Sequence, residues 1–119
     1  MDFEKKKAIY LQIADYVCEQ ILLQNWLEGK KIPSVRELAV DIQVNPNTVM
    51  RAYAYLEEKN IIETQRGIGY FVANLALKHA VNIVKHEFIF QDLPQMFKSM
   101  KLLGIEIDQI VEHYEMRKK

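Results

Sequence analysis

Several features that mark particular protein classes are absent from the sequence. There is a single cysteine among 119 residues, so no internal disulfide can form and a reducing compartment is expected. No apolar stretch reaches the ~20 residues that span a bilayer, and no apolar run follows the basic start, as a secretory signal requires. These absences predict a soluble cytoplasmic protein that has no membrane partner.

The formal net charge at pH 7 is zero, because 16 basic residues balance 16 acidic ones. This balance counts against a strongly electrostatic nucleic-acid binder, for which a basic domain is usual. It does not exclude one, because a binding face is local. Half of the residues are hydrophobic and 27% are charged, so the chain can bury a core. The length suits one compact domain with an accessory segment.

Apolar periodicity predicts two helices in the first third of the chain. The first begins within residues 5–8 and runs to about Gln24, with one apolar stripe along it. The second is short and ends near residues 41–42. Its start is marked by Ser34 as N-cap and Glu37 three residues later, which is the pattern of a capping box.

A third helix follows after a break of about three residues. Asn45 suits its N-cap, Pro46 suits its first position, and Asn60 suits a left-handed stop. Two β-rich runs come next, over residues 61–65 and 70–73, and they flank the tetrapeptide Arg-Gly-Ile-Gly. Because both glycines can adopt positive φ, this segment predicts a hairpin with a short loop.

A short helix, a tight turn and a second helix predict a helix-turn-helix, whose second helix fits the major groove of DNA. Helical spacing divides the third helix into two faces. The predicted buried face consists of Val49, Ala52, Tyr53 and Leu56. The predicted outer face consists of Asn47, Met50, Arg51 and Ala54, flanked by Thr48 and Tyr55. No acidic residue occurs between Ile42 and Leu56, so nothing there repels phosphate.

The residue types of this outer face suit direct contact with bases. Asparagine can bond an adenine edge, arginine can bond guanine bidentately, and threonine, alanine or methionine can touch a thymine methyl. Phosphates can be held by the two helix N-termini, Ser34, Thr48 and Arg36. Plainer interpretations stay open: capping alone explains Asn45 and Pro46, and Arg51 can be a solvated surface side chain.

Three motifs resemble the DNA-binding domain of the GntR family of bacterial transcription regulators. They are "IPSVRELA", "VNPNTVMRAY-x-x-L" and "I-x-x-x-x-G-x-G-x-FV", and the match runs from about Tyr10 to Val72. The Asn-Pro-Asn-Thr-Val form is similar to the YtrA-type branch, whose members carry a short helical tail. The resemblance implies a mainly α fold with a small β-hairpin wing, that is, a winged helix-turn-helix followed by a helical dimerisation arm.

The resemblance also implies a function and a set of contacts. Such proteins bind an inverted-repeat operator as homodimers, and for this chain we expect a repressor. Their DNA contacts correspond here to Arg36, Asn45, Asn47, Thr48, Arg51 and the wing tip Arg66–Gly67. Many members carry a polar residue where Met50 stands, and wider relatives carry arginine where Pro46 stands. Both departures favour a distinct operator, with a methyl contact from Met50.

The segment after the hairpin is predicted to be helical, with an interruption near Asp92 caused by Pro94 and a stop at Gly104. We therefore expect a DNA-binding domain over residues 1–74 and a dimerisation tail over residues 75–119. The apolar stripes of the tail are too long for the small DNA-binding domain of the same chain to cover. An amphipathic helix must bury its apolar face, so a second copy is expected to cover it. The residues expected to dimerise are Val84, Phe88, Leu93, Met96, Phe97, Met100, Leu103, Ile107, Ile110, Val111 and Tyr114.

No metal site or cofactor is predicted. His79 and His86 are seven residues apart, whereas helical metal ligands need a spacing of three or four. A small-molecule site lined by Met96, Phe97 and Met100 at a dimer interface is a weaker alternative to simple packing. The sequence does not predict whether an effector exists.

An enzyme is not expected, because no Gly-rich phosphate loop, no nucleophile with a base and no ligand cluster is present. Two classes of function remain. The first is a dimeric transcriptional regulator that binds DNA. The second, motivated by the zero net charge, is a winged-helix protein-interaction module that has lost DNA binding.

Overall fold

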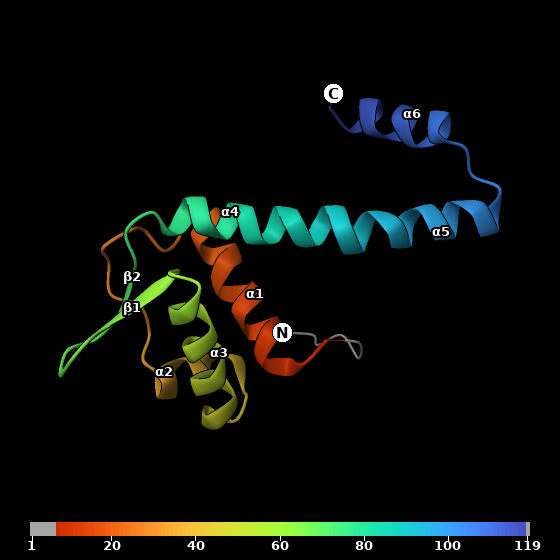
Figure 1. Ribbon diagram of the computed structural model, residues 1–119. Coiled ribbons are helices and arrows are strands. Elements are labelled where there is room, and N and C mark those ends of the chain that lie inside the picture. Colours follow the sequence, from red (N-terminus) through yellow and green to blue (C-terminus); the bar gives the residue numbers. More distant parts are fainter. Residues whose placement is uncertain (1–6, 119) are drawn as a thin grey trace. The chain divides into compact units, whose positions relative to one another are not determined.

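The computed structural model describes residues 7–118 and is mainly helical with one two-stranded hairpin (Figure 1). Its elements are, in order, α1 (Ile9–Leu22), α2 (Val35–Ile42), α3 (Pro46–Glu58), β1 (Ile62–Gln65), β2 (Gly69–Val72), α4 (Ala76–Glu87), the π-helical turn η1 (Phe88–Asp92), α5 (Leu93–Leu103) and α6 (Ile107–Lys118). The chain divides into two compact units. The N-terminal unit ends at Val84 and the C-terminal unit begins at Lys85.

Helix α1 forms one wall of the core of the N-terminal unit. Its apolar stripe is buried as its spacing predicts. The helix is shorter than predicted at both ends. It begins at Ile9 rather than within residues 5–8, of which 5 and 6 lie outside the described residues. It ends at Leu22 rather than near Gln24, because Gln24 has a left-handed φ of 60°, which an α-helix does not accommodate.

The starts of α2 and α3 carry the predicted caps. The Ser34 hydroxyl accepts a hydrogen bond from the Glu37 backbone at 3.1 Å, and the Glu37 carboxylate accepts one from the Ser34 backbone at 2.9 Å. This reciprocal pair is the predicted capping box. Asn45 caps α3, Pro46 opens it, and Asn60 has the predicted left-handed φ, at 60°.

The hairpin is antiparallel, and its strands differ from the predicted ranges by one residue. Ile62 pairs with Val72, and Gln65 pairs with Gly69 at the turn. A short upstream segment adds to this sheet: the Ile32 backbone donates to the Tyr70 carbonyl at 2.9 Å. The wing is therefore held on one side by the chain that leads into α2.

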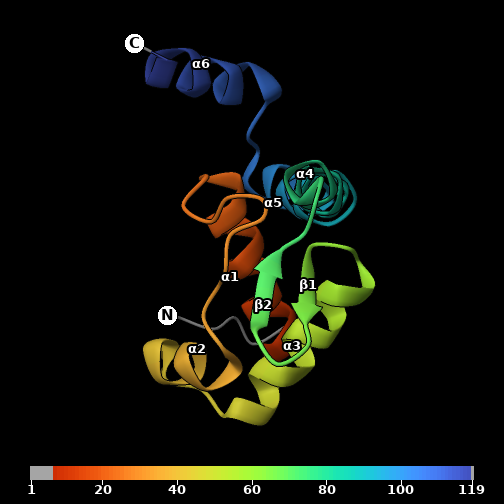
Figure 2. The same ribbon diagram turned by 90° about the vertical axis from the view of Figure 1, so that its left-hand side faces the viewer.

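Tyr53 lies at the centre of the N-terminal unit and is fully buried. Its hydroxyl donates a 2.7 Å hydrogen bond to the Pro33 carbonyl just before α2. Its ring meets Tyr70 of β2 edge-on, with the centroids 4.8 Å apart. One residue of α3 thus fixes both the entry to α2 and the base of the wing. Figures 1 and 2 both show α2 beside α3, with the hairpin next to α3.

The first turns of α4 belong to the N-terminal unit. Ala76 and Ala80 are completely buried in its core, and Leu77, Ile83 and Val84 pack against it. Helix α4 begins after Leu75, which has a left-handed φ of 63°. The hairpin ends at Val72, whereas the compact unit continues to Val84.

The C-terminal unit is helical throughout most of its length. The α-helical pattern is interrupted over η1, where Pro94 predicts an interruption. Proline has no N–H to donate, and its ring crowds the carbonyl four residues earlier. The wider π-helical turn relieves this crowding. Gly104, at a φ of 68°, ends α5 as predicted. Among residues 7–118, no helix combines the length and hydropathy needed to cross a bilayer.

Candidate nucleic-acid interface

The segment α2–turn–α3 has the geometry of a helix-turn-helix. Gln43 adopts a left-handed φ of 57° and ends α2, and Asn45 returns to an extended conformation before α3. The Val44 backbone donates to the Ala39 carbonyl at 3.0 Å, and its side chain packs on the core. The two helices are therefore joined by a short turn that is fixed to the body of the domain.

Helix α3 presents the face that its spacing predicts. Val49, Ala52, Tyr53 and Leu56 are all completely buried. The outer face, with Asn47, Met50, Arg51 and Ala54, is exposed, and Thr48 and Tyr55 are half-buried at its flanks. Met50 is 55% exposed, which leaves it available for contact with a partner.

Asn45 and Asn47 have different roles at the start of α3. The Asn45 side-chain oxygen accepts a 2.8 Å hydrogen bond from the Asn47 backbone, so it serves the cap. Bidentate contact with adenine needs both the oxygen and the amino group of the side chain. The capping bond fixes the orientation of the Asn45 amide, whereas the exposed Asn47 side chain can turn both groups toward a base.

Arg51 lies against an aromatic ring of another helix. Its guanidinium carbon is 4.0 Å from the ring centroid of Tyr10, near the start of α1. Tyr10 in turn meets Tyr55 edge-on, with centroids 6.2 Å apart. The sequence placed Arg51 on the outer face correctly but gave no sign of Tyr10, because nothing in the spacing of two separate helices indicates this contact.

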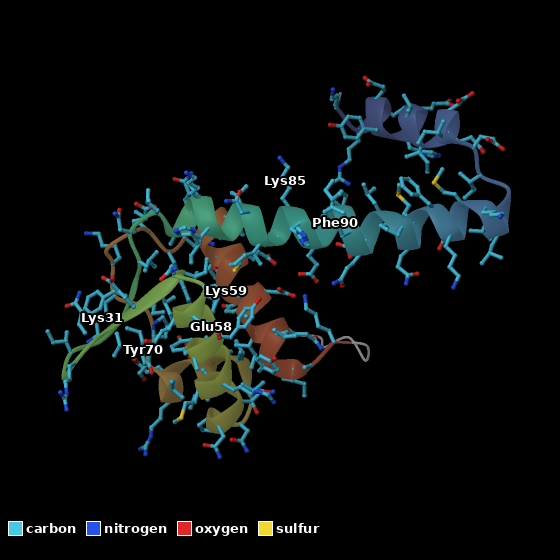
Figure 3. All side chains as sticks on the ribbon, in the orientation of Figure 1. Lys31, Glu58, Lys59, Tyr70, Lys85 and Phe90 are labelled. Atoms are coloured by element: carbon cyan, nitrogen blue, oxygen red, sulfur yellow. The ribbon has the colours of Figure 1, made fainter. Side chains whose placement is uncertain are left out.

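The acids of α3 lie at its C-terminal end. Glu57 accepts a 2.8 Å hydrogen bond from the Thr64 hydroxyl of β1, which ties this carboxylate to the hairpin. Glu58 is exposed next to Lys59 at the end of the helix (Figure 3). The first turns of α3 therefore present an acid-free surface.

The N-terminus of α2 places Ser34 and Arg36 at the surface. Both residues are exposed, and within residues 7–118 Arg36 forms no ion pair with a carboxylate. Glu37 is also exposed. Its pKa is held below the ordinary value by the hydrogen bonds from the Ser34 backbone and hydroxyl, so it stays negative at neutral pH. This end of α2 therefore exposes Arg36 as a cation beside Glu37 as an anion.

The wing tip carries Arg66 and Gly67, both exposed, followed by Ile68, which is 59% exposed. Gly67 has a φ of 76°, which favours glycine. Gly69 has a φ of 142°, and a Cβ added there would lie 2.9 Å from the Lys31 side chain. Sequence reasoning missed Lys31, whose side chain lies along the wing near Tyr70 (Figure 3).

Comparison with known proteins identifies this architecture. The family model of bacterial regulatory proteins of the gntR family matches residues 9–72. This chain belongs to the GntR family. The matched residues run from the start of α1 to the end of β2, which confirms the resemblance seen in the three motifs and the winged helix-turn-helix fold.

Related GntR-type proteins match well beyond the winged domain. The HTH-type transcriptional regulator YhcF of Bacillus subtilis is 40% identical over 110 residues, which cover 92% of this chain and 89% of YhcF. The HTH-type transcriptional repressor YtrA of the same organism is 38% identical over 112 residues, 94% of this chain and 85% of YtrA. A GntR-family structure from Bacteroides thetaiotaomicron has a TM-score of 0.72 at 44% identity and covers 93% of this chain and 97% of its own.

Membership of the GntR family assigns α2–turn–α3 as a DNA-binding helix-turn-helix and the protein as a transcriptional regulator. It is not an enzyme. The individual DNA contacts stay predictions. The structure brings Asn47, Met50 and Arg51 together on one exposed face, and Arg36 and Arg66 lie at the surface of other elements.

The C-terminal unit of this GntR protein carries most of the residues predicted to dimerise. Its described residues include none that is buried. Half or more of the side chain surface is exposed at Phe88, Phe97, Leu103, Ile107, Val111 and Tyr114. Leu93, Met96, Met100 and Ile110 are half-buried. Val84 differs from the rest, because it packs against the core of the N-terminal unit.

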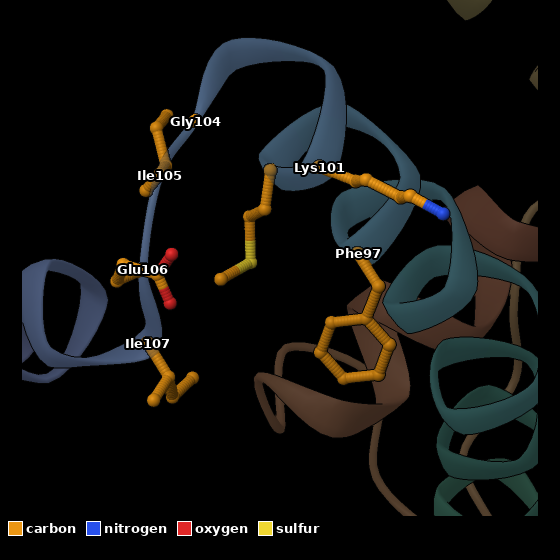
Figure 4. Close-up of a pocket in the computed structure, with 7 residues that line it drawn as sticks. Phe97, Lys101, Gly104, Ile105, Glu106 and Ile107 are labelled. Atoms are coloured by element: carbon orange, nitrogen blue, oxygen red, sulfur yellow. The ribbon is translucent and has the colours of Figure 1, made fainter.

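A cavity of about 400 Å³ lies where α5 turns into α6. It is lined by Phe97, Met100, Lys101, Gly104, Ile105, Glu106 and Ile107. The Glu106 carboxylate points toward the cavity, whereas the Lys101 side chain extends away from it (Figure 4). Of the residues suggested for a small-molecule site, Phe97 and Met100 line this cavity and Met96 does not.

Metal ligation finds no support in residues 7–118, where no three histidine, cysteine, aspartate or glutamate side chains gather as a metal site needs. His79 is half-buried. His86 packs against the ring of Phe90, with centroids 4.6 Å apart. Figure 3 shows Phe90 projecting from η1, where it is 66% exposed.

Proposed function

We propose that this GntR-family regulator binds an inverted-repeat operator as a homodimer and represses transcription. The observation that carries the proposal is the exposed, acid-free outer face of α3, with Asn47, Met50 and Arg51 on it. These side chains offer donors, an acceptor and an apolar contact, which are the groups that distinguish base pairs in the major groove. Binding to chromosomal DNA implies a cytoplasmic location.

Contacts outside α3 fix the protein on the duplex. At the N-terminus of α2, the exposed Arg36 suits a phosphate. The wing tip, with Arg66 and Gly67 both exposed, suits contact with the minor groove. Since net charge is zero, these local groups supply the electrostatic part of binding.

The homodimer is supported by the apolar surface of the C-terminal unit. A helix with large exposed apolar side chains is stabilised when a second copy covers them. Two identical copies related by a two-fold axis then match an operator with two inverted half-sites. Similarity to the repressor YtrA over most of both chains supports repression rather than activation.

Selection of bound duplexes from random DNA, with the full chain, tests this proposal. We expect enrichment of two inverted half-sites about one helical turn, roughly 10 base pairs, apart. Affinity should fall steeply with salt, as expected for phosphate contacts. A reporter gene placed behind the selected operator should lose expression when the protein is present.

Matched arginine variants sharpen the selection. Arg51→Ala should weaken binding to the selected operator and relax the preference at one position of each half-site, by about 1–3 kcal/mol. Arg117→Ala removes the same side chain from the last turn of α6 and should leave the preference unchanged. If the wild-type chain enriches no sequence, and Arg51→Ala behaves like Arg117→Ala, the protein-interaction module becomes the better assignment.

A further inference from the structure

The contact between α1 and the outer face of α3 points to a further residue in DNA recognition. The Arg51 guanidinium lies over the Tyr10 ring at 4.0 Å, and the Tyr10 ring is braced edge-on by Tyr55, one helical turn beyond Arg51. We call these three side chains the Tyr10 stack. It joins α1 to the outer face of α3.

The stack holds the arginine without occupying its hydrogen-bonding groups. Within residues 7–118, Arg51 forms no ion pair with a carboxylate, so its guanidinium is held by a ring face. A guanidinium presents five N–H donors in a fixed plane, and contact with an aromatic face leaves those donors for other partners. Arg51 is exposed, so these donors face solvent or a ligand.

Restricting an arginine before binding favours bidentate recognition. A free arginine loses much rotamer freedom when it bonds both acceptors of a guanine. An arginine already held by a ring loses less. The same restriction disfavours other rotamers in which the guanidinium could bond a mismatched base or a neighbouring phosphate.

We propose that Tyr10 is a positioning residue that sets the sequence discrimination of Arg51 while touching no base itself. The inference rests on the proposed function, because it concerns the same DNA-binding face. It adds α1 to the specificity-determining elements. The tyrosine hydroxyl has no part in it, since the ring face makes the contact.

The test compares ring-retaining and ring-removing variants of the full chain on the selected operator and on its single base-pair substitutions. Tyr10→Phe keeps the ring and should bind like the wild type at every position. Tyr10→Leu removes the ring and should lower discrimination about two- to fivefold, the strength of an exposed cation–π contact. The loss should fall at the base pair whose preference Arg51→Ala relaxes, with the salt dependence unchanged.

A double variant separates positioning from a general effect. Tyr10→Leu should cause no further loss of discrimination in an Arg51→Ala background, because the side chain that it positions is already gone. Thermal unfolding confirms that each variant is folded. If Tyr10→Leu does not fold, Tyr10→Met serves as a second variant without the ring.

Several results would overturn the inference. An equal loss on all sequences would assign Tyr10 to stability or phosphate binding, and a loss in Tyr10→Phe would assign its hydroxyl to DNA. Tighter binding by Tyr10→Leu would mean that the ring competes with DNA for Arg51. Failure of the proposed function looks different: the wild-type chain itself would then prefer no sequence, and the inference would fall with it.

Discussion

Asn45 shows how the needs of the fold limit what a single side chain can offer to DNA. Its oxygen caps α3 by accepting from the Asn47 backbone, at 2.8 Å. Turning this amide to meet an adenine edge with both of its groups would break the capping bond and leave a helix N–H unsatisfied, at a cost of about 1 kcal/mol. Asn45 is therefore better suited to a phosphate, through its amino group, than to an adenine edge.

Substitution of Asn45 by aspartate separates these roles. Aspartate is an equally good cap, so the free energy of unfolding should change by no more than about 0.5 kcal/mol. DNA affinity should fall about tenfold on all sequences, because a donor is lost and a negative charge faces phosphate. Asn45→Ser, which caps without charge, should lose less. Fluorescence anisotropy with several duplexes measures the DNA affinity of both variants. A loss of affinity confined to one base pair would instead assign Asn45 to base contact.

Met50 is the outer-face residue whose replacement should change specificity most directly. Its side chain is 55% exposed beside Arg51, where a methyl contact with thymine is chemically suited. Met50→Arg should shift the preferred base at one half-site position, toward guanine, by about 1–3 kcal/mol. Met116→Arg adds the same charge to an exposed site of α6 and is the control. Selection from random DNA measures the preferred base for each variant. A uniform gain of affinity on all sequences would show that residue 50 faces a phosphate rather than a base.

At the scale of elements, Tyr53 holds the DNA-binding face together. It joins α3 to the Pro33 carbonyl before α2 by a 2.7 Å hydrogen bond and to Tyr70 of the wing by a ring contact at 4.8 Å. Burial raises the pKa of its hydroxyl well above the ordinary tyrosine value, so it remains a donor across the physiological pH range. One side chain thus contacts α3's two neighbours, the entry to α2 and the wing.

Tyr53→Phe should therefore destabilise the N-terminal unit while keeping its ring contacts. The lost hydrogen bond leaves the Pro33 carbonyl without its donor, and a cost of about 1–3 kcal/mol is expected. Urea unfolding should show a lower midpoint with an unchanged slope. Tyr16→Phe removes a hydroxyl from a half-buried tyrosine of α1 and is the matched control. An equal midpoint for the two variants would mean that the bond to Pro33 contributes nothing.

Prediction from sequence succeeded for elements whose signals are local. The capping box at Ser34 and the Asn45–Pro46 start depend on residues within a turn of one another, and both are confirmed. The Tyr10 contact with Arg51 depends on how two helices pack, which spacing along one helix does not contain. Pro94 indicated an interruption, but not that the helical backbone would continue through a π-helical turn.

At the scale of the whole molecule, the two units differ in how they satisfy their apolar side chains. The N-terminal unit buries its own around Tyr53 and reaches into α4, where Ala76 and Ala80 are fully buried. The described part of the C-terminal unit buries none. A chain that leaves such a surface on one unit and the proposed base-contacting face on the other is suited to couple assembly to operator binding.

The predicted dimer stripe of α5 can be tested by charges placed on either side of the helix. Phe97 lies on the stripe with Leu93 and Met100, whereas Leu102 falls on the opposite side and is 78% exposed. Phe97→Glu should weaken the dimer about 100-fold or more, because an unpaired carboxylate would be buried in the interface. Leu102→Glu should leave the dimer intact.

Sedimentation equilibrium gives the dimer dissociation constant of each variant. The affinities for DNA with one half-site and with two half-sites show how dimerisation affects DNA binding. Monomeric Phe97→Glu should bind an isolated half-site like the wild type but lose most of the gain that a second half-site confers, because that gain comes from linking two binding events. Dissociation by Leu102→Glu to the same degree would place the interface off the predicted stripe. A wild-type chain that sediments as a monomer at all concentrations, yet binds both half-sites, would show instead that the operator assembles the dimer.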